Sequence, residues 1–171
     1  LRPLVDDMLR SMNHFSWYRS ERWLEAPVGL GRVAPSVAGA VPAPVSHGAR
    51  TMMLVWTGEI FNGARLQDRL GRAGHRFSDG SQPELVLHLF EAYGSEAFGM
   101  LDGCFALALW DRTRRRLTVA TDRFSARPIF YTLRSGRFVF ASEVKAVLTV
   151  PAVGRTVNDR AVAEFFALEH L

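Results

Sequence analysis

The chain has 171 residues, of which 48% are hydrophobic and 22% are charged, as in an ordinary globular domain. This composition excludes a disordered, collagen-like or disulfide-rich chain. The net charge of +4 does not indicate a nucleic-acid partner, because the basic residues are scattered among acidic ones. The one basic cluster, residues 112–116, lies between two apolar stretches and predicts an exposed hairpin tip. No stretch reaches the roughly 18 apolar residues that a membrane helix needs, so we expect no membrane contact.

The single cysteine, Cys104, lies in an apolar run and predicts a buried, reduced thiol in a cytoplasmic protein. We expect one domain over residues 1–171, truncated at its N-terminus, because the first residue is Leu1.

Hydrophobic periodicity predicts the elements in chain order. We expect helices over 3–13, 64–73, 84–93 and from 159 to the end, and an irregular loop over 33–48. We expect strands over 52–56, 104–110, 117–121, 129–133 and 137–141. Several strands are apolar on both faces, which favours two stacked sheets covered outside by helices and an α+β class.

Local signals define the helix ends and one turn. Ser81 and Glu84 form a capping-box pattern before the helix over 84–93. Gly74 and Gly94 supply the stop signals for the two middle helices. A short turn around Ser135-Gly136 is expected to join the last two strands.

Generic catalytic and metal-binding motifs are missing from the sequence. The five histidines share no ligand spacing, so we expect surface or hydrogen-bonded histidines and no metal site in this domain. His88 follows Glu84 by four residues, which is typical of a pair on one helix face.

Three segments are more informative. In Trp56-Thr-Gly-Glu-Ile-Phe-Asn-Gly63, the N–H of Gly58 could face a ligand oxygen and Glu59 could hold an ammonium group; the alternative is an ordinary strand-end turn. The second is Leu101-Asp-Gly103 and the strand that follows it. In the third, over 121–131 and 140–146, acids and bases alternate among aromatic residues. That pattern favours structural ion pairs, and its charged residues are Asp122, Arg123, Glu143 and Lys145.

Together these segments resemble the glutaminase domain of the asparagine synthetase family, the class II glutamine amidotransferases. The matching segments are Gly58-Glu-Ile-Phe-Asn62, Gly74-His-Arg-Phe77, Leu101-Asp-Gly-Cys-Phe-Ala-Leu-Ala-Leu-Trp-Asp111, Asp122-Arg-Phe-Ser-Ala-Arg-Pro-Ile-Phe-Tyr131 and Phe140-Ala-Ser-Glu-Val-Lys-Ala146. Their order and spacing match from about residue 50 to the end. The resemblance implies a four-layer αββα sandwich of the N-terminal-nucleophile hydrolase type.

The departures from the family pattern cluster at the glutamine site. The family uses an N-terminal cysteine whose α-amine is the base; this chain begins after that point, and Cys104 lies within a strand, so we assign no catalytic residue. The oxyanion-hole asparagine of the family is Thr57 here, beside Gly58 and Glu59. The acid that helps to hold the glutamine ammonium is Gln82.

Two further positions differ. The arginine that the family uses for the glutamine carboxylate is matched by Arg32, in a segment that otherwise matches the family pattern poorly. The glycine of the family's D-R-x-G motif is Ser125.

The resemblance implies an N-terminal domain of an ATP-dependent amide-forming enzyme, and the departures favour weak or no glutamine hydrolysis. One alternative is a working glutaminase domain whose cysteine is missing from this sequence, and another is a non-catalytic binding or scaffold domain. The implied partner is a C-terminal ATP-pyrophosphatase synthetase domain. ATP and magnesium are expected there, and no cofactor is expected in this domain. Glutamine and, in a homodimer, a second copy of the chain are further possible partners, which the sequence does not decide.

Overall fold

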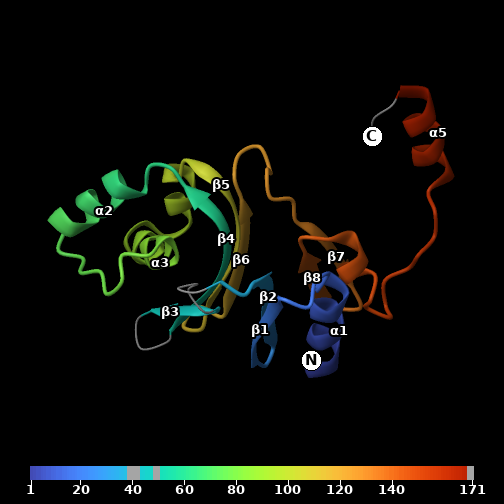
Figure 1. The fold of residues 1–171 in the computed structure, drawn as a ribbon, viewed down its shortest axis with the longest axis horizontal. Coiled ribbons are helices and arrows are strands. Elements are labelled where there is room, and N and C mark those ends of the chain that lie inside the picture. The colour runs from blue at the N-terminus through green and yellow to red at the C-terminus, as the bar shows by residue number, and fades with distance from the viewer. Residues whose placement is uncertain (38–42, 48–50, 169–171) are drawn as a thin grey trace.

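The computed structural model describes residues 1–37, 43–47 and 51–168, and its elements form a layered α+β arrangement (Figure 1). The helices are α1 (Arg2–Met12), α2 (Gly63–Arg72), α3 (Gln82–Tyr93), the 3₁₀ helix η1 (Gly94–Met100), α4 (Val144–Val147) and α5 (Asp159–Leu168). The strands are β1 (Tyr18–Glu25), β2 (Val28–Pro35), β3 (Val45–His47), β4 (Met52–Ile60), β5 (Gly103–Asp111), β6 (Arg116–Thr121), β7 (Phe130–Arg134) and β8 (Arg137–Ala141).

The middle of the fold is an antiparallel sheet in the order β3-β4-β5-β6, and its central strands β4 and β5 contribute side chains to a core on each face. Successive side chains of a strand point to opposite faces. Leu54 and Trp56 of β4 accordingly belong to a core shared with α3, whereas Met53 belongs to a second core shared with β2. This two-sided burial confirms the prediction made from the apolar run over 52–56.

Helices cover the stacked sheets on both outer sides. Helices α2 and α3 lie on one side of the middle sheet, and the β1–β2 hairpin lies on the other (Figure 1). Helix α1 packs its Val5 and Leu9 side chains against Gly29 and Gly31 of β2. A third core joins α1 to β8 and α4. The layers therefore follow the order helix, sheet, sheet, helix, as the family resemblance implied.

The loop expected over 33–48 is shorter in the structure. Strand β2 continues to Pro35, and β3 pairs with β4 through Val45 and Leu54. Residues 38–42 of that predicted loop lie outside the described part of the chain. Edge strands such as β3 are short and weakly patterned, which explains why the sequence did not indicate it.

The predicted Ser81 cap, the end of α3 at Gly94 and the β7–β8 turn are present. Ser81 caps α3 by accepting a hydrogen bond from the Glu84 N–H at 3.3 Å, and Gly94 ends the helix. Ser135 and Gly136 form the β7–β8 turn with positive φ. The basic cluster over 112–116 is an exposed hairpin tip, as predicted.

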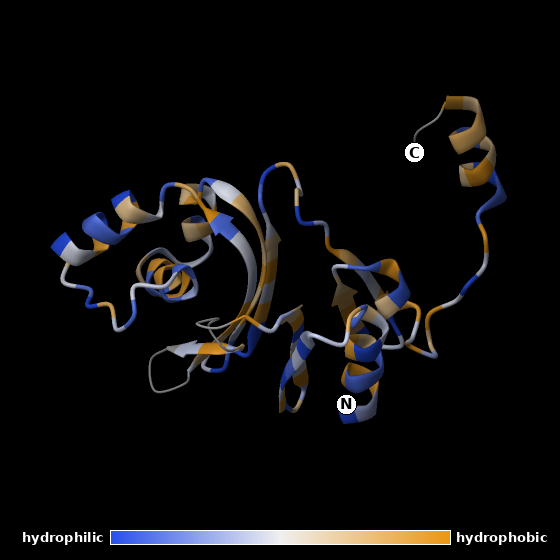
Figure 2. Ribbon diagram, viewed as in Figure 1, coloured by the Kyte–Doolittle hydropathy of each residue, from blue (hydrophilic) through white to orange (hydrophobic). Residues whose placement is uncertain are grey.

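Helix α5 differs from the other helices because none of its residues is buried. Figure 1 shows it standing away from the layers, and Figure 2 shows that it is largely hydrophobic. The last three residues of the helix expected there lie outside the described part. Among the described helices, none has the length and apolar character that crossing a membrane requires.

Candidate functional site

The end of β4 holds three of the expected site residues in one short segment. Thr57 and Glu59 are exposed, and Gly58 between them has a φ of +121°. A Cβ atom at Gly58 would lie 2.1 Å from the carbonyl oxygen of Cys104 on β5. Both the backbone conformation and the close approach of β5 therefore require glycine at this position.

The same close approach occurs from the opposite strand. A Cβ atom at Gly103 of β5 would lie 2.2 Å from the carbonyl oxygen of Glu59. The backbones of β4 and β5 are thus in direct contact on both sides of the pairing between Glu59 and Cys104. This contact fixes the backbone that presents Thr57 and Glu59 to solvent. Cys104 itself is a free thiol within β5, as predicted, but it is half-buried and so less buried than its apolar run predicts.

Gln82, the fourth expected residue, lies beside this segment. It occupies the first turn of α3, and its side-chain amide bonds to both backbone groups of Ile60, the last residue of β4. The Ile60 N–H donates to Oε1 at 2.9 Å, and Nε2 donates to the Ile60 carbonyl at 3.3 Å. The amide therefore connects α3 to β4.

Arg32, the fifth expected residue, lies in a different sheet. Its Nη2 donates to Oε2 of Glu21 at 2.6 Å, and its Nε donates to the same oxygen at 3.1 Å. The pair is formed across β1 and β2, where Glu21 and Arg32 are register partners, and both side chains are mostly buried. The carboxylate of Glu21 thus already neutralises the guanidinium.

Asn62, the last residue of the Gly58-Glu-Ile-Phe-Asn62 motif, fixes the geometry around the strand end. Its Nδ2 donates to the Met100 carbonyl at 2.9 Å, and its Oδ1 accepts from the Asp102 N–H at 3.1 Å. These bonds fasten the start of β5 to the end of β4. The sequence contained the signal, since an asparagine directly before a helix commonly bonds to nearby backbone groups.

Asp122 is buried, but the prediction that it forms an ion pair is wrong. Its carboxylate accepts hydrogen bonds from the backbone N–H groups of Phe105, Phe124 and Ala126, at 2.9 to 3.2 Å. Burial opposes ionisation, but these donors hold the pKa of Asp122 below its ordinary value. Its sequence neighbour Arg123 is exposed.

The turn after Asp122 contains Ser125, which has a φ of +50°. The backbone here adopts the left-handed conformation that favours glycine, which is the residue of the family motif at this position.

Glu143 and Lys145 form an ion pair at 3.1 Å, but both side chains are partly exposed. His14 lies between the same two groups, with its Nε2 3.0 Å from Oε1 of Glu143. Burial opposes ionisation of Glu143, while His14 and Lys145 lower the pKa of this carboxyl. The expectation of a structural ion pair is confirmed for Glu143 and Lys145, although the pair is not buried.

Glu84 is a buried carboxylate held by the loop before α3. It accepts hydrogen bonds from the N–H groups of Ser78 at 2.5 Å, Asp79 at 3.0 Å and Gly80 at 2.8 Å. Burial opposes its ionisation, but the three donors lower the pKa of Glu84 from 4.5 to about 2. In the expected capping box, this side chain would have reached back to Ser81; it bonds to the preceding loop instead.

The histidines are not all isolated. Nδ1 of His75 lies 3.0 Å from Nδ1 of His88, and Glu91 lies beside both rings. Their separation of thirteen residues hid this pairing from the sequence patterns.

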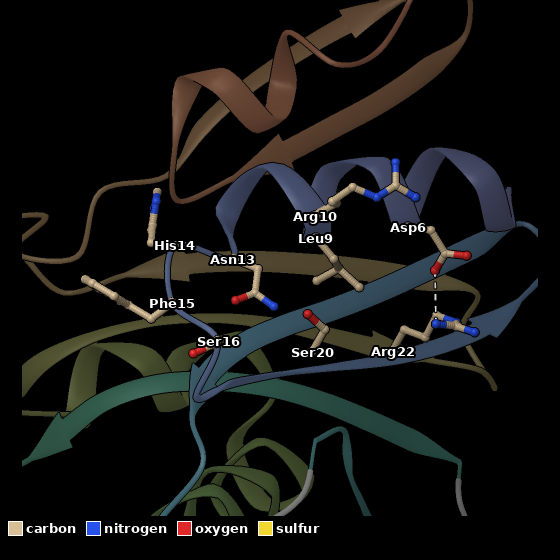
Figure 3. Close-up of a pocket in the computed structure, with 9 residues that line it drawn as sticks. All are labelled: Asp6, Leu9, Arg10, Asn13, His14, Phe15, Ser16, Ser20 and Arg22. Carbon is tan, nitrogen blue, oxygen red and sulfur yellow. Dashed lines mark ion pairs between the residues drawn. The ribbon is translucent and has the colours of Figure 1, made fainter.

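A shallow groove of about 540 Å³ lies between α1 and β1 (Figure 3). An ion pair of 3.1 Å between Asp6 and Arg22 closes one end of it. Its lining contains none of the five expected site residues. The exposed strand end around Thr57 and Glu59 is therefore a separate feature.

The layers form a fold of the N-terminal-nucleophile hydrolase type. The structure superposes on the glutamine phosphoribosylpyrophosphate amidotransferase of B. subtilis, complexed with ADP and GMP, with a TM-score of 0.61 and 24% identity. The match covers 73% of this chain and 30% of that one. It establishes the fold class.

The family follows from the sequence comparison. Residues 2–171 match the model of the glutamine amidotransferase domain family, and the chain belongs to that family. It is 33% identical over 130 residues to "Asparagine synthetase [glutamine-hydrolyzing] 3" of Bacillus subtilis (strain 168), covering 76% of this chain and 21% of the relative. It is 36% identical over 104 residues to "Putative asparagine synthetase [glutamine-hydrolyzing] 1" of Methanocaldococcus jannaschii, covering 61% of this chain and 18% of the relative. The chain thus spans about a fifth of the length of these curated relatives.

Proposed function

We propose that this amidotransferase domain belongs to an ATP-dependent amide-forming enzyme and that its glutamine hydrolysis is weak or absent. The observation that carries the proposal is the double hydrogen bond of Gln82 to Ile60. The residue that the family uses to hold an ammonium group is here neutral, and its amide already has two backbone partners.

The neighbouring positions support the same proposal. Thr57 takes the place of the oxyanion-hole asparagine, and loss of one such donor costs on the order of 10²–10³ in rate. Replacement of an acid by Gln82 removes a charge-assisted bond to the ammonium, worth roughly 1.5–3 kcal/mol. Arg32, the proposed partner of the glutamine carboxylate, is paired with Glu21. The three changes act on three different groups: the oxyanion that develops at the side-chain amide, the α-ammonium and the α-carboxylate.

The proposed partner is a synthetase domain, as the names and lengths of the relatives suggest. The use of ATP and magnesium in that domain is what the family resemblance implies. Helix α5 supplies a candidate contact surface. Phe165, Phe166 and Leu168 are about half-exposed or more, and an apolar helix face of this kind is typical of an interface. In this proposal the nitrogen donor is free ammonia or an amine.

A working glutaminase is the second candidate. It is favoured by Gly58 and Glu59, which keep the family residues at an exposed strand end. In that case Thr57 would take over the role of the missing asparagine.

Two measurements separate the candidates. Isothermal titration of glutamine into the chain should give no binding at millimolar concentration, and the full-length enzyme should form its amide with ammonia but release no glutamate from glutamine. The double variant Thr57→Asn/Gln82→Asp restores the family residues and should bind glutamine more tightly than the parent. Millimolar binding by the parent, together with steady glutamate release, would contradict the proposal.

A further inference from the structure

Two histidines and a glutamate converge where the segment after α2 meets α3. Gly74, with a φ of +95°, ends the α2 region, and the His75 N–H then donates to the Leu70 carbonyl at 3.0 Å. This turn brings His75 back against α3. On α3, His88 and Glu91 are three residues apart and therefore lie on one face.

Three donor atoms meet at one point. The two Nδ1 atoms of His75 and His88 are 3.0 Å apart, and Oε2 of Glu91 lies 3.8 Å from the first and 3.9 Å from the second. Zinc bonds of about 2.0–2.1 Å in a tetrahedron place ligand atoms roughly 3.3 Å apart. The observed spacings lie on either side of this value. The side chain of Glu91 is 48% exposed, so a change of its rotamer can bring the carboxylate closer to the two rings.

The ring positions are held by packing. The side chain of His88 is only 6% exposed, and its ring makes edge contacts with the rings of Phe77 and His75. Two Nδ1 atoms that face each other need a shared proton, because two lone pairs at this distance repel. A metal ion in place of that proton binds both lone pairs at once.

The opposite side of the His88 ring faces a second carboxylate. Oε1 of Glu84 lies 3.9 Å from Nε2 of His88, and three backbone N–H groups hold Glu84 in place. A carboxylate behind a ligating histidine favours the tautomer with the proton on the far nitrogen and strengthens the ligand. In that tautomer the lone pair of Nδ1 faces His75 and Glu91.

We propose that His75, His88 and Glu91 bind a divalent transition-metal ion of the zinc type, with the fourth position open to water on the exposed side of Glu91. Imidazole and carboxylate ligands suit this class of ion. The ion would fasten the loop after α2 to α3, the helix that also carries Gln82. The inference is independent of whether the domain hydrolyses glutamine.

The test is zinc binding by the untagged full chain, which is first stripped with a chelator and then incubated with zinc and freed of excess metal. We expect one zinc ion per chain by elemental analysis, micromolar or tighter affinity, and, with cobalt(II) as the probe, the intense visible absorption of a tetrahedral site. His75→Ala and Glu91→Gln should each weaken zinc binding by roughly tenfold to 100-fold. His14→Ala is the matched control and should change nothing, because His14 contacts Glu143 and Lys145 instead.

Circular dichroism shows whether each variant folds. Glu91→Gln changes an exposed carboxylate and decides the question even if His75→Ala is unstable. Absence of stoichiometric zinc in the parent overturns the proposal. So does parent-like affinity in folded Glu91→Gln, or an equal loss in His14→Ala.

Discussion

The side-chain amide of Gln82 hydrogen-bonds to both backbone groups of Ile60, accepting from its N–H and donating to its carbonyl. This bond pair joins the first turn of α3 to the last residue of β4, one residue beyond Glu59. A carboxylate at position 82 could accept from the N–H but could not donate to the carbonyl. With glutamine in place of the family's acid, the strand end lacks a negative charge at position 82 but gains a second hydrogen bond between α3 and β4.

Gln82→Ala tests this connection. The substitution leaves the partly buried backbone groups of Ile60 without their partner, so the free energy of unfolding should fall by about 1–3 kcal/mol. Denaturant unfolding measures the change. Gln67→Ala is the control: Gln67 makes one exposed bond to the Gly80 carbonyl, and its loss should cost much less. Equal effects of the two substitutions would show that the Gln82 bonds are weak.

Substitution by alanine should have opposite effects on stability at two glycines, one in the close contact of β4 and β5 and one on the open surface of α2. Gly58→Ala places a methyl group against the Cys104 carbonyl at a φ of +121°, and should destabilise the chain by on the order of 3 kcal/mol or more. Gly71→Ala, within α2 and with no atom near the new methyl group, should raise stability by roughly 0.5–1 kcal/mol. Thermal unfolding of both variants checks the pair. A soluble Gly58→Ala chain with the parent's Tm would contradict the described backbone approach.

Asp122→Asn tests the hydrogen bonds that backbone N–H groups donate to the Asp122 carboxylate. The amide keeps the size of the carboxylate but presents an NH₂ group to N–H donors such as those of Phe105 and Phe124, so Tm should fall clearly. Asp7→Asn is the control, because Asp7 is exposed and its partner is the exposed Arg10. If both variants have the same Tm as the parent, Asp122 does not stabilise the connection between β6 and β7.

Glu84 predicts a loss of stability in acid. Its pKa is about 2 in the folded chain and near 4.5 when unfolded, so its ionised form favours folding. That contribution is complete above about pH 4.5 and is lost as the pH falls towards 2. Unfolding measured over this range should show a smaller pH dependence in Glu84→Gln than in the parent. At neutral pH the variant should lose about 1.5–3 kcal/mol, because it gives up hydrogen bonds to a charged acceptor. An unchanged acid slope would contradict the assignment.

Local patterns determined most of the elements. The apolar run over 52–56 predicted a strand buried on both faces, and β4 has that environment because alternate side chains enter two different cores. Ser81, Gly94 and the Ser135-Gly136 turn were readable because caps and turns depend on a few neighbouring residues. The sequence motifs also indicated the family, which the comparison confirms.

Contacts between distant segments were decided only by the tertiary structure. Asp122 was expected to pair with a basic residue, but the strand and turn around it supply N–H donors that no pattern of side chains reveals. The amide of Gln82 meets Ile60, and His75 meets His88, only after α3 has packed against the middle sheet. A sequence lists which groups can donate and accept, but the layer packing determines which of them come within 3 Å of each other.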